Sequence, residues 1–141
     1  MGKAGEFVLL LLRVGMGGML LGYHGWGKLQ GAAAYLFAGA EWGMPRVVAA
    51  DGLPFPAFFA VCAALAESVG ALLLAIGLRT REAAAIVAIN MAVAVSHHMR
   101  SDWRVESALL YLLPALLFVF VPAGRFSVDG LLRGRAPVKK K

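Results

Sequence analysis

The chain has 141 residues, of which 60% are hydrophobic and only 16% are charged, and its mean hydropathy is +0.74. A soluble domain carries about 25% charged residues, so this composition favours a single domain whose solvent is lipid. The net charge of +6 lies at the ends of apolar runs and in the C-terminal tail. Because no continuous basic face results, nucleic acid is not an expected partner. The single cysteine, Cys62, excludes an internal disulfide and a CxxC redox motif.

Four apolar stretches approach or exceed the roughly 20 residues needed to cross a bilayer. The third is short and is interrupted by polar residues, but its neighbours favour a membrane helix there too. We therefore predict an all-α integral membrane protein, a four-transmembrane-helix antiparallel bundle. Its crossings cover about residues 7–29, 55–78, 83–99 and 105–121, within one domain over residues 1–130, and a basic cytoplasmic tail follows over residues 131–141.

The connections between these crossings differ in length. The turn over residues 77–82 is tight and predicts an antiparallel hairpin of the second and third helices. By contrast, residues 30–54 are long and far from hydrophilic, with Tyr35, Phe37 and Trp42. That composition predicts an interfacial helix or re-entrant segment in the first outer loop.

Lys and Arg residues in short flanks predict the orientation. One side of the four-helix arrangement holds nine of them: Lys3, Arg79, Arg81, Arg125, Arg133, Arg135, Lys139, Lys140 and Lys141. The other side holds four: Lys28, Arg46, Arg100 and Arg104. Without the final three lysines the ratio is still six to four. We therefore expect both termini in the cytoplasm.

Ionisable groups inside membrane helices are costly and usually face the bundle interior. Arg13, Glu67 and Asn90 fall at roughly 10 to 16 Å from the inner boundary when counted at about 1.5 Å per residue. Neither charge would be stable alone, so we expect an Arg13–Glu67 pair with Asn90 nearby. A purely structural clamp that fixes the bundle is the equal alternative for this pair.

A second polar layer is expected near the outer boundary. Arg13 and His24 are eleven residues apart, and Asn90 and His97 are seven apart, so each pair returns to within roughly 20° of the same helix face. Two helices therefore present polar lines that run from mid-membrane outward. The remaining members of the outer layer are Lys28, His98 and Glu106.

The histidines also allow interpretations without a ligand-binding role, or with a haem or a metal ion as ligand. They are more often interfacial residues that hydrogen-bond water than ligands. Haem ligation by His24 with His97 or His98 is disfavoured, because facing histidines are common and the site lies close to the boundary. A dinuclear metal site needs more carboxylates than Glu67 and Glu106 provide, and no HExxH spacing for zinc is present. We therefore predict no metal site.

A stripe of small residues lies on the opposite face of the first helix. It consists of Gly15, Gly18, Gly22 and Gly25 and contains a GxxxG motif. Small residues let helices approach closely in lipid. Packing against a neighbouring helix of the same chain is the favoured interpretation, and a homo-oligomer through this face is the alternative.

The chain resembles the DoxX family of small four-helix membrane proteins over about residues 7–130. The features that carry the resemblance are Arg13, residues 23–29 (YHGWGKL), 52–56 (GLPFP), 64–70 (ALAESVG) and 77–81 (GLRTR), Asn90, Met91, His97, and residues 122–129 (PAGRFSVD). No single motif is specific, but their order and spacing together are. The long tryptophan-containing outer loop departs from the family pattern and suits a docking surface.

The resemblance implies a cytoplasmic (inner) membrane protein of a bacterium or archaeon, associated with quinone-reducing oxidoreductases such as thiosulfate:quinone oxidoreductase or with quinone detoxification. The leading hypothesis is an accessory, quinone-interacting subunit whose electron donor is another protein subunit, since the chain has no evident cofactor site. His24, His97, Glu67 and Arg13, in that order, would bind the quinone and exchange protons, because the pKa of His lies near 6.5. The alternatives are a structural or assembly subunit without chemistry of its own, and a small transporter or proton path.

Overall fold

The computed structural model describes residues 2–134, which form six continuous helices and no strand. The all-α prediction is therefore confirmed over this part of the chain. Two of the six helices contain a π-helical turn, labelled η. The elements are α1 (Lys3–Leu20), η1 (Leu21–Gly25) and α2 (Trp26–Ala38) in the first helix, then α3 (Met44–Ala50), then α4 (Pro56–Leu65), η2 (Ala66–Gly70) and α5 (Ala71–Ile76) in one helix, and finally α6 (Thr80–Ser101), α7 (Glu106–Phe120) and α8 (Val128–Gly134).

Three of the helices within residues 2–134 are long and apolar enough to cross a membrane: Lys3–Ala38, Pro56–Ile76 and Thr80–Ser101. The fourth apolar helix, α7, has 15 residues, or about 22 Å of length, which is less than the roughly 30 Å of a hydrocarbon core. It ends at Phe120 because the backbone becomes extended just before Pro122. The expected four-helix arrangement is thus present as three full-length candidate spans and one shorter apolar helix.

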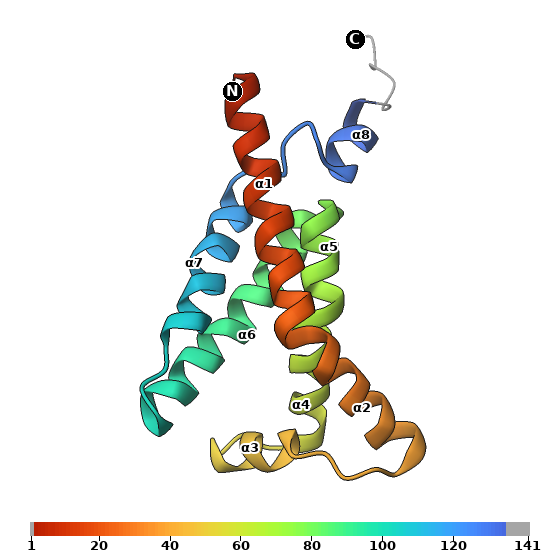
Figure 1. Ribbon diagram of the computed structural model, residues 1–141, viewed down its shortest axis with the longest axis vertical. Coiled ribbons are helices and arrows are strands. Elements are labelled where there is room, and N and C mark those ends of the chain that lie inside the picture. The colour runs from red at the N-terminus through yellow and green to blue at the C-terminus, as the bar shows by residue number, and fades with distance from the viewer. Residues whose placement is uncertain (1, 135–141) are drawn as a thin grey trace.

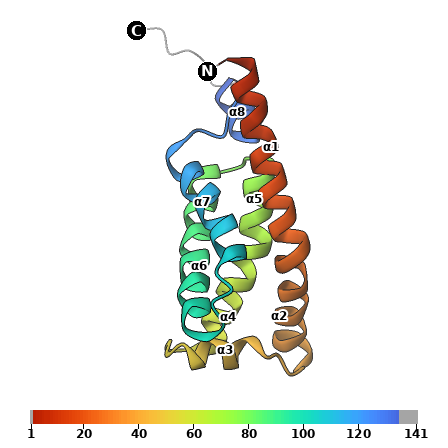
Figure 2. The ribbon, with the colours of Figure 1, turned by 60° about the vertical axis from the view of Figure 1, so that its left-hand side comes forward.

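The helices run side by side between two ends (Figure 1). The N-terminus, the α5–α6 turn and α8 lie together at one end, which we call the terminal end. The end of α2, the α6–α7 turn and α3 lie at the opposite end, which we call the α3 end. Figure 2 shows α3 lying across this end, roughly perpendicular to the other helices.

The first helix is longer than the sequence predicted. It continues past residue 29 to Ala38, and Gly39 then ends it in the left-handed conformation, with φ of 64°. The continuation has a simple cause, since residues 26–38 contain no proline and include three consecutive alanines that favour helix. Within residues 30–54, for which an interfacial helix or re-entrant segment was predicted, the structure has one separate short helix, α3, with Pro45 in its first turn.

The core lies between α1, α5, α6 and α7. Leu20, Leu74, Val87 and Phe118 are fully buried there. Gly17 allows α1 to approach α5 closely, because a Cβ at this position would lie 2.6 Å from the backbone oxygen of Ala71. A large set of apolar side chains faces outward, each more than half exposed, as expected for contact with lipid: Phe7, Leu11, Ile86, Ile89, Leu110 and Leu113.

The expected basic tail coincides only partly with the structure. Residues 131–134 are helical and belong to α8. The remaining residues of the expected tail, Arg135 and Lys139 to Lys141 among them, lie outside the described residues.

Candidate functional site

Arg13 of α1 connects α5 and the segment after α7 at the terminal end of the bundle. Only 1% of it is exposed, and its guanidinium donates hydrogen bonds to three backbone carbonyls, those of Ala75 at 3.1 Å, Phe126 at 2.6 Å, and Ala123. Ala75 lies in the last turn of α5, where helix carbonyls carry partial negative charge. The predicted Arg13–Glu67 pair is therefore wrong, because the cation is satisfied by backbone oxygens toward the terminal end.

Asp129 closes the same end by capping α6. Its carboxylate accepts hydrogen bonds from the backbone N–H of Arg79 at 2.8 Å and from the N–H and hydroxyl of Thr80 at 2.9 and 2.8 Å. Burial alone would raise the pKa of Asp129, but these hydrogen bonds outweigh it and hold the pKa below its usual value. Gly77 leaves space for the Arg13 guanidinium, because a Cβ at Gly77, whose φ is 72°, would lie 2.8 Å from the guanidinium carbon.

Glu67 has a different cation from the one expected. The ammonium of Lys28 donates to its two carboxylate oxygens at 2.6 and 2.7 Å. Asn90 donates from Nδ2 to the same carboxylate at 3.0 Å, so the prediction that Asn90 lies beside Glu67 is confirmed. Glu67 is 3% exposed, so a buried carboxylate is matched by one charged and one neutral donor from two other helices.

Two π-helical turns place this network. Lys28 follows η1 by three residues, and Glu67 lies inside η2. The two turns pack directly against each other, because a Cβ added at Gly25 would overlap the backbone carbonyl of Glu67. Isolated π turns inside α-helices occur frequently at functional sites. Here they let the first two long helices meet closely where their polar side chains face each other.

A second polar contact, between His97 and Asp51, lies toward the α3 end. Nδ1 of His97 is 2.9 Å from both carboxylate oxygens of Asp51, and Arg100 approaches the same carboxylate at 3.9 Å. Asp51 is the residue that ends α3, so this pair ties α3 to α6. A carboxylate at Nδ1 holds the imidazole in one orientation and leaves Nε2 for another partner.

The two networks line one cavity of about 240 Å³. Its polar lining includes Lys28, Asp51, Glu67, Asn90 and His97, and apolar side chains of α3, α4 and α6 complete the wall. Asn90 and His97 thus share one face of α6, as their seven-residue spacing predicted. Because α3 contributes to the wall, the cavity lies beneath this helix, toward the interior of the bundle.

His24 lies on the other side of the Lys28–Glu67 pair. Its ring contacts Tyr111 edge to face, at 5.5 Å between centroids. His24, Tyr111 and His98 line a separate cavity of about 60 Å³, which Lys28 and Glu67 also border. His98 additionally bonds Asp102 at 2.9 Å, and this hydrogen bond lowers the pKa of Asp102.

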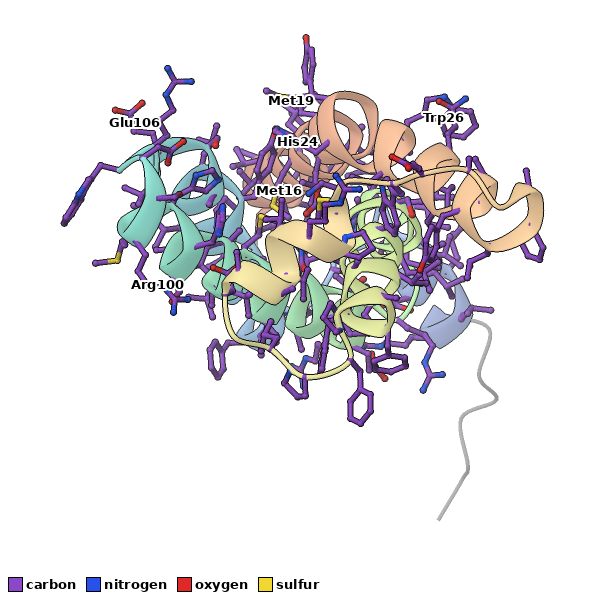
Figure 3. The ribbon with its side chains drawn as sticks, turned by 90° about the horizontal axis from the view of Figure 1, so that it is seen from below. Met16, Met19, His24, Trp26, Arg100 and Glu106 are labelled. Atoms are coloured by element: carbon purple, nitrogen blue, oxygen red, sulfur yellow. The ribbon has the colours of Figure 1, made fainter. Side chains whose placement is uncertain are left out.

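Figure 3 views the molecule from the α3 end and labels His24 on the first helix, and the contact of its ring with Tyr111 shows that the side chain faces α7. Glu106 and Arg100 lie at the rim in the same view. Of the predicted outer layer, Lys28, His97 and His98 border the 240 Å³ cavity. Glu106 is exposed and lies on neither of the two cavities described here.

The predicted glycine face divides into two parts. Gly25 packs within the chain, as described above. Gly15, Gly18 and Gly22 are exposed, and a Cβ at any of them would meet no atom within 4 Å. Packing of these three inside the chain is therefore wrong, and Gly17 on the neighbouring face makes the close approach instead. The error arose because spacing identifies a small-residue face but not the helix that covers it.

Sequence reasoning missed Asp51 and Tyr111. Asp51 and Glu41 are the two acidic residues of the mainly apolar segment 30–54, and two histidines were expected at the same boundary. An acidic residue and histidines expected at the same boundary could have predicted the contact of Asp51 with His97. Tyr111 gave no such signal, because an aromatic residue in an apolar helix is ordinary. Within residues 2–134, no three His, Cys, Asp or Glu side chains gather closely enough to hold a metal ion.

Comparison with known proteins places the chain in a family. No curated protein and no solved structure matches it. The match to a family model covers residues 8–99, which includes Lys28, Glu67, Asn90 and His97 but not the C-terminal residues 122–129. Because this match covers well over half of the 141 residues, the chain belongs to the DoxX family of membrane proteins.

Proposed function

We propose that this protein binds a quinone or quinol in the cavity beneath α3, as a subunit of a membrane oxidoreductase system. The observation that carries the proposal is a polar cavity inside a membrane protein, lined by two charged networks and bordered by apolar walls. Ligand pockets are typically apolar with a few convergent polar groups. A quinone head group has that character, with two carbonyl oxygens on a flat, otherwise apolar ring.

The donors needed for the carbonyls are available in the lining. Lys28 has three N–H donors, of which two go to Glu67, and Asn90 has two, of which one goes to Glu67. One proton of each group therefore remains for a ligand. His97 donates from Nδ1 to the Asp51 carboxylate, so Nε2 of the neutral imidazole is an acceptor, suited to the hydroxyl of a quinol. Lys28 and Asn90, from α2 and α6, therefore supply the donors for a quinone carbonyl, and His97 supplies an acceptor for a quinol hydroxyl.

The reaction also sets what the rest of the system must supply. Reduction of a quinone to a quinol takes up two electrons and two protons. The His97–Asp51 and Lys28–Glu67 pairs border the cavity, so they are the groups that would exchange these protons with a bound quinone. The electrons come from a redox-active partner protein. Arg13, in contrast, binds backbone carbonyls near the terminal end and takes no part.

Equilibrium binding of a short-tailed quinone to the protein in lipid nanodiscs tests this proposal. Glu67→Gln removes the negative charge and one of the two acceptor oxygens that position Lys28 and Asn90, and we expect binding to weaken by about tenfold or more, equivalent to about 1.4 kcal/mol. Glu106→Gln is the matched control, because Glu106 lies on neither cavity, and we expect it to bind normally. No binding to the wild type, or equal binding by both variants, would refute the proposal.

The competing assembly role makes a different prediction. If the polar networks serve only to hold the bundle together, co-purification with partner subunits should fall in step with the stability of each variant. Quinone should then be absent from protein purified in mild detergent. A variant that keeps its thermal stability and its partners but loses quinone, such as His97→Gln, would decide against that role.

We further propose that α7 completes a fourth crossing with both termini in the cytoplasm. Its 15 residues run beside α6, and the segments before and after it are short. Reporter fusions after Ser101 and after Gly134 should fall on opposite sides of the membrane, with the second in the cytoplasm. The same side for both fusions would leave three crossings.

A further inference from the structure

The polar cavity is one end of a longer surface feature. It adjoins an apolar pocket of about 340 Å³ between α4 and α6, with which it shares Ala63, Asn90 and Val93. That pocket shares Cys62 and Ile86 with a further one of about 520 Å³. We call the two apolar pockets together the lipid-facing groove.

The groove follows the contact between the Pro56–Ile76 helix and α6. The 520 Å³ pocket reaches Arg79 and Glu82 at the α5–α6 turn, which lies at the terminal end. From Asn90 to Glu82 the groove follows eight residues of α6, or about 12 Å. Polar cavity and groove therefore form one path from beneath α3 toward the opposite end of the bundle.

The shape and chemistry of the groove suit a flexible apolar chain. Small residues of the Pro56–Ile76 helix, Ala66 and Gly70, line it together with larger apolar side chains. Ile86 forms part of the wall and is 54% exposed. The path begins at the polar groups around Glu67 and continues through apolar lining, which matches a molecule with one polar end and a long apolar tail.

The depth of the polar end distinguishes between such molecules. Asn90 precedes the end of α6 at Ser101 by eleven residues, or about 16 Å of helix. A phospholipid keeps its charged head group at the membrane surface, because its transfer into the hydrocarbon layer is costly. A quinone has an uncharged head group that can lie at this depth.

From these observations we infer that the lipid-facing groove holds the isoprenoid tail of the quinone whose head group occupies the polar cavity. The protein therefore selects quinones by tail length as well as by head group. This inference rests on the proposed function, and it adds a tail-binding surface formed by α4, η2, α5 and α6.

The chain has a natural reporter for this surface. Cys62 is its single cysteine, is exposed, and lines both pockets of the groove. The experiment measures the rate at which a membrane-permeant maleimide alkylates Cys62 in nanodiscs. The ligands are quinones with one head group and either no tail or several isoprene units. At about ten times its dissociation constant, a ligand that covers the thiol should slow alkylation about tenfold.

We expect the long-tailed quinone to protect Cys62 and the tail-less quinone to bind without protecting it. A Cys62→Ala, Leu113→Cys variant is the control. Leu113 is exposed on α7 and lies outside the groove, so neither quinone should protect it. Ile86→Trp should remove the preference for the long tail and keep tail-less binding, whereas Leu113→Trp should change neither.

Two results would overturn the inference, and they differ from failure of the proposed function. Long-tailed quinone that binds without protecting Cys62 would remove the groove and keep the head-group site. Protection by phospholipid or by a polyprenol without a head group, equal to that by the quinone, would make the groove an ordinary lipid contact. Failure of every quinone to bind, with or without a tail, would instead refute the proposed function.

Discussion

Glu67 forms its ion pair with Lys28 and not with Arg13, and this difference can be tested by measuring the free energy of unfolding of variants. The structure pairs Glu67 with Lys28, at 2.6 Å, and pairs Arg13 with backbone carbonyls. A double-mutant cycle of Lys28→Met with Glu67→Gln should therefore show strong coupling. A second cycle of Arg13→Met with Glu67→Gln should show almost none. The two cycles share one variant, so they differ only in the cation removed.

The magnitudes follow from burial. Breaking a buried ion pair by removing one partner costs about 3–5 kcal/mol, and we expect about 3 kcal/mol for Lys28→Met. The lower end applies because the Lys28 side chain is 29% exposed and water reaches the pair, whereas the Glu67 side chain is only 4% exposed. Glu67→Gln leaves a cation that water can hydrate, so it should cost about 1 kcal/mol. Removing both charges leaves neither unpaired, which gives a coupling of about 2 kcal/mol.

The assay is reversible unfolding in mixed micelles, with helix content followed against the fraction of denaturing detergent. The wild type, the three single variants and the two double variants all need the same unfolding slope for the comparison to hold. We expect the Arg13 and Glu67 effects to add within about 0.5 kcal/mol, since the two residues share no partner. Coupling below that value for Lys28 with Glu67, together with a larger value for Arg13, would refute this account of the charges.

Three further predictions concern the ends and the helix contact. Arg13→Met should lower the free energy of unfolding by about 2–4 kcal/mol, because buried carbonyls lose charged donors; the same micelle assay measures it, and a change under about 1 kcal/mol would contradict it. Gly25→Ala should destabilise by about 1–3 kcal/mol through overlap with Glu67, whereas Gly22→Ala should be neutral because its surroundings are open. Asp129→Ala should cost about 1 kcal/mol at neutral pH through loss of the cap. The folded-state pKa of Asp129 is lowered. Its contribution to the free energy of unfolding is therefore complete above its ordinary pKa of about 3.9 and is lost as the pH falls through the folded-state pKa. The difference in stability between wild type and Asp129→Ala should shrink in acid, and a difference that widened would contradict this prediction.

The sequence predicted the helices well because lipid imposes a strong pattern. Apolar runs of sufficient length can be counted directly, and three of the long helices coincide with such runs. The length of the first span was harder. The first helix continues through the alanines at residues 32–34, since nothing there breaks a helix. The last apolar helix, α7, begins and ends within one residue of the predicted 105–121, because its apolar run ends at Pro122.

The polar site was predicted as a set of residues more successfully than as a set of pairs. Spacing along α6 brought Asn90 and His97 to one face, and they line the same cavity. The pairing of Arg13 with Glu67 failed because residue counting gives depth but not the azimuth of one helix relative to the next. Residue counting also does not predict which backbone carbonyls are free to accept hydrogen bonds. Arg13 donates to the carbonyls of residues 75, 123 and 126.

The division of the charges has a consequence for how the protein works. Arg13 and Asp129 stabilise the terminal end through contacts that no cavity ligand would touch. At the α3 end, Lys28, Glu67 and His97 make contacts that a ligand can share or replace, because each also borders the cavity. A membrane bundle that fixes one end with backbone contacts can leave the other end able to exchange partners. Stability and ligand binding should therefore respond to different substitutions, and variants at Arg13 should lose the fold before they lose the proposed binding of a quinone.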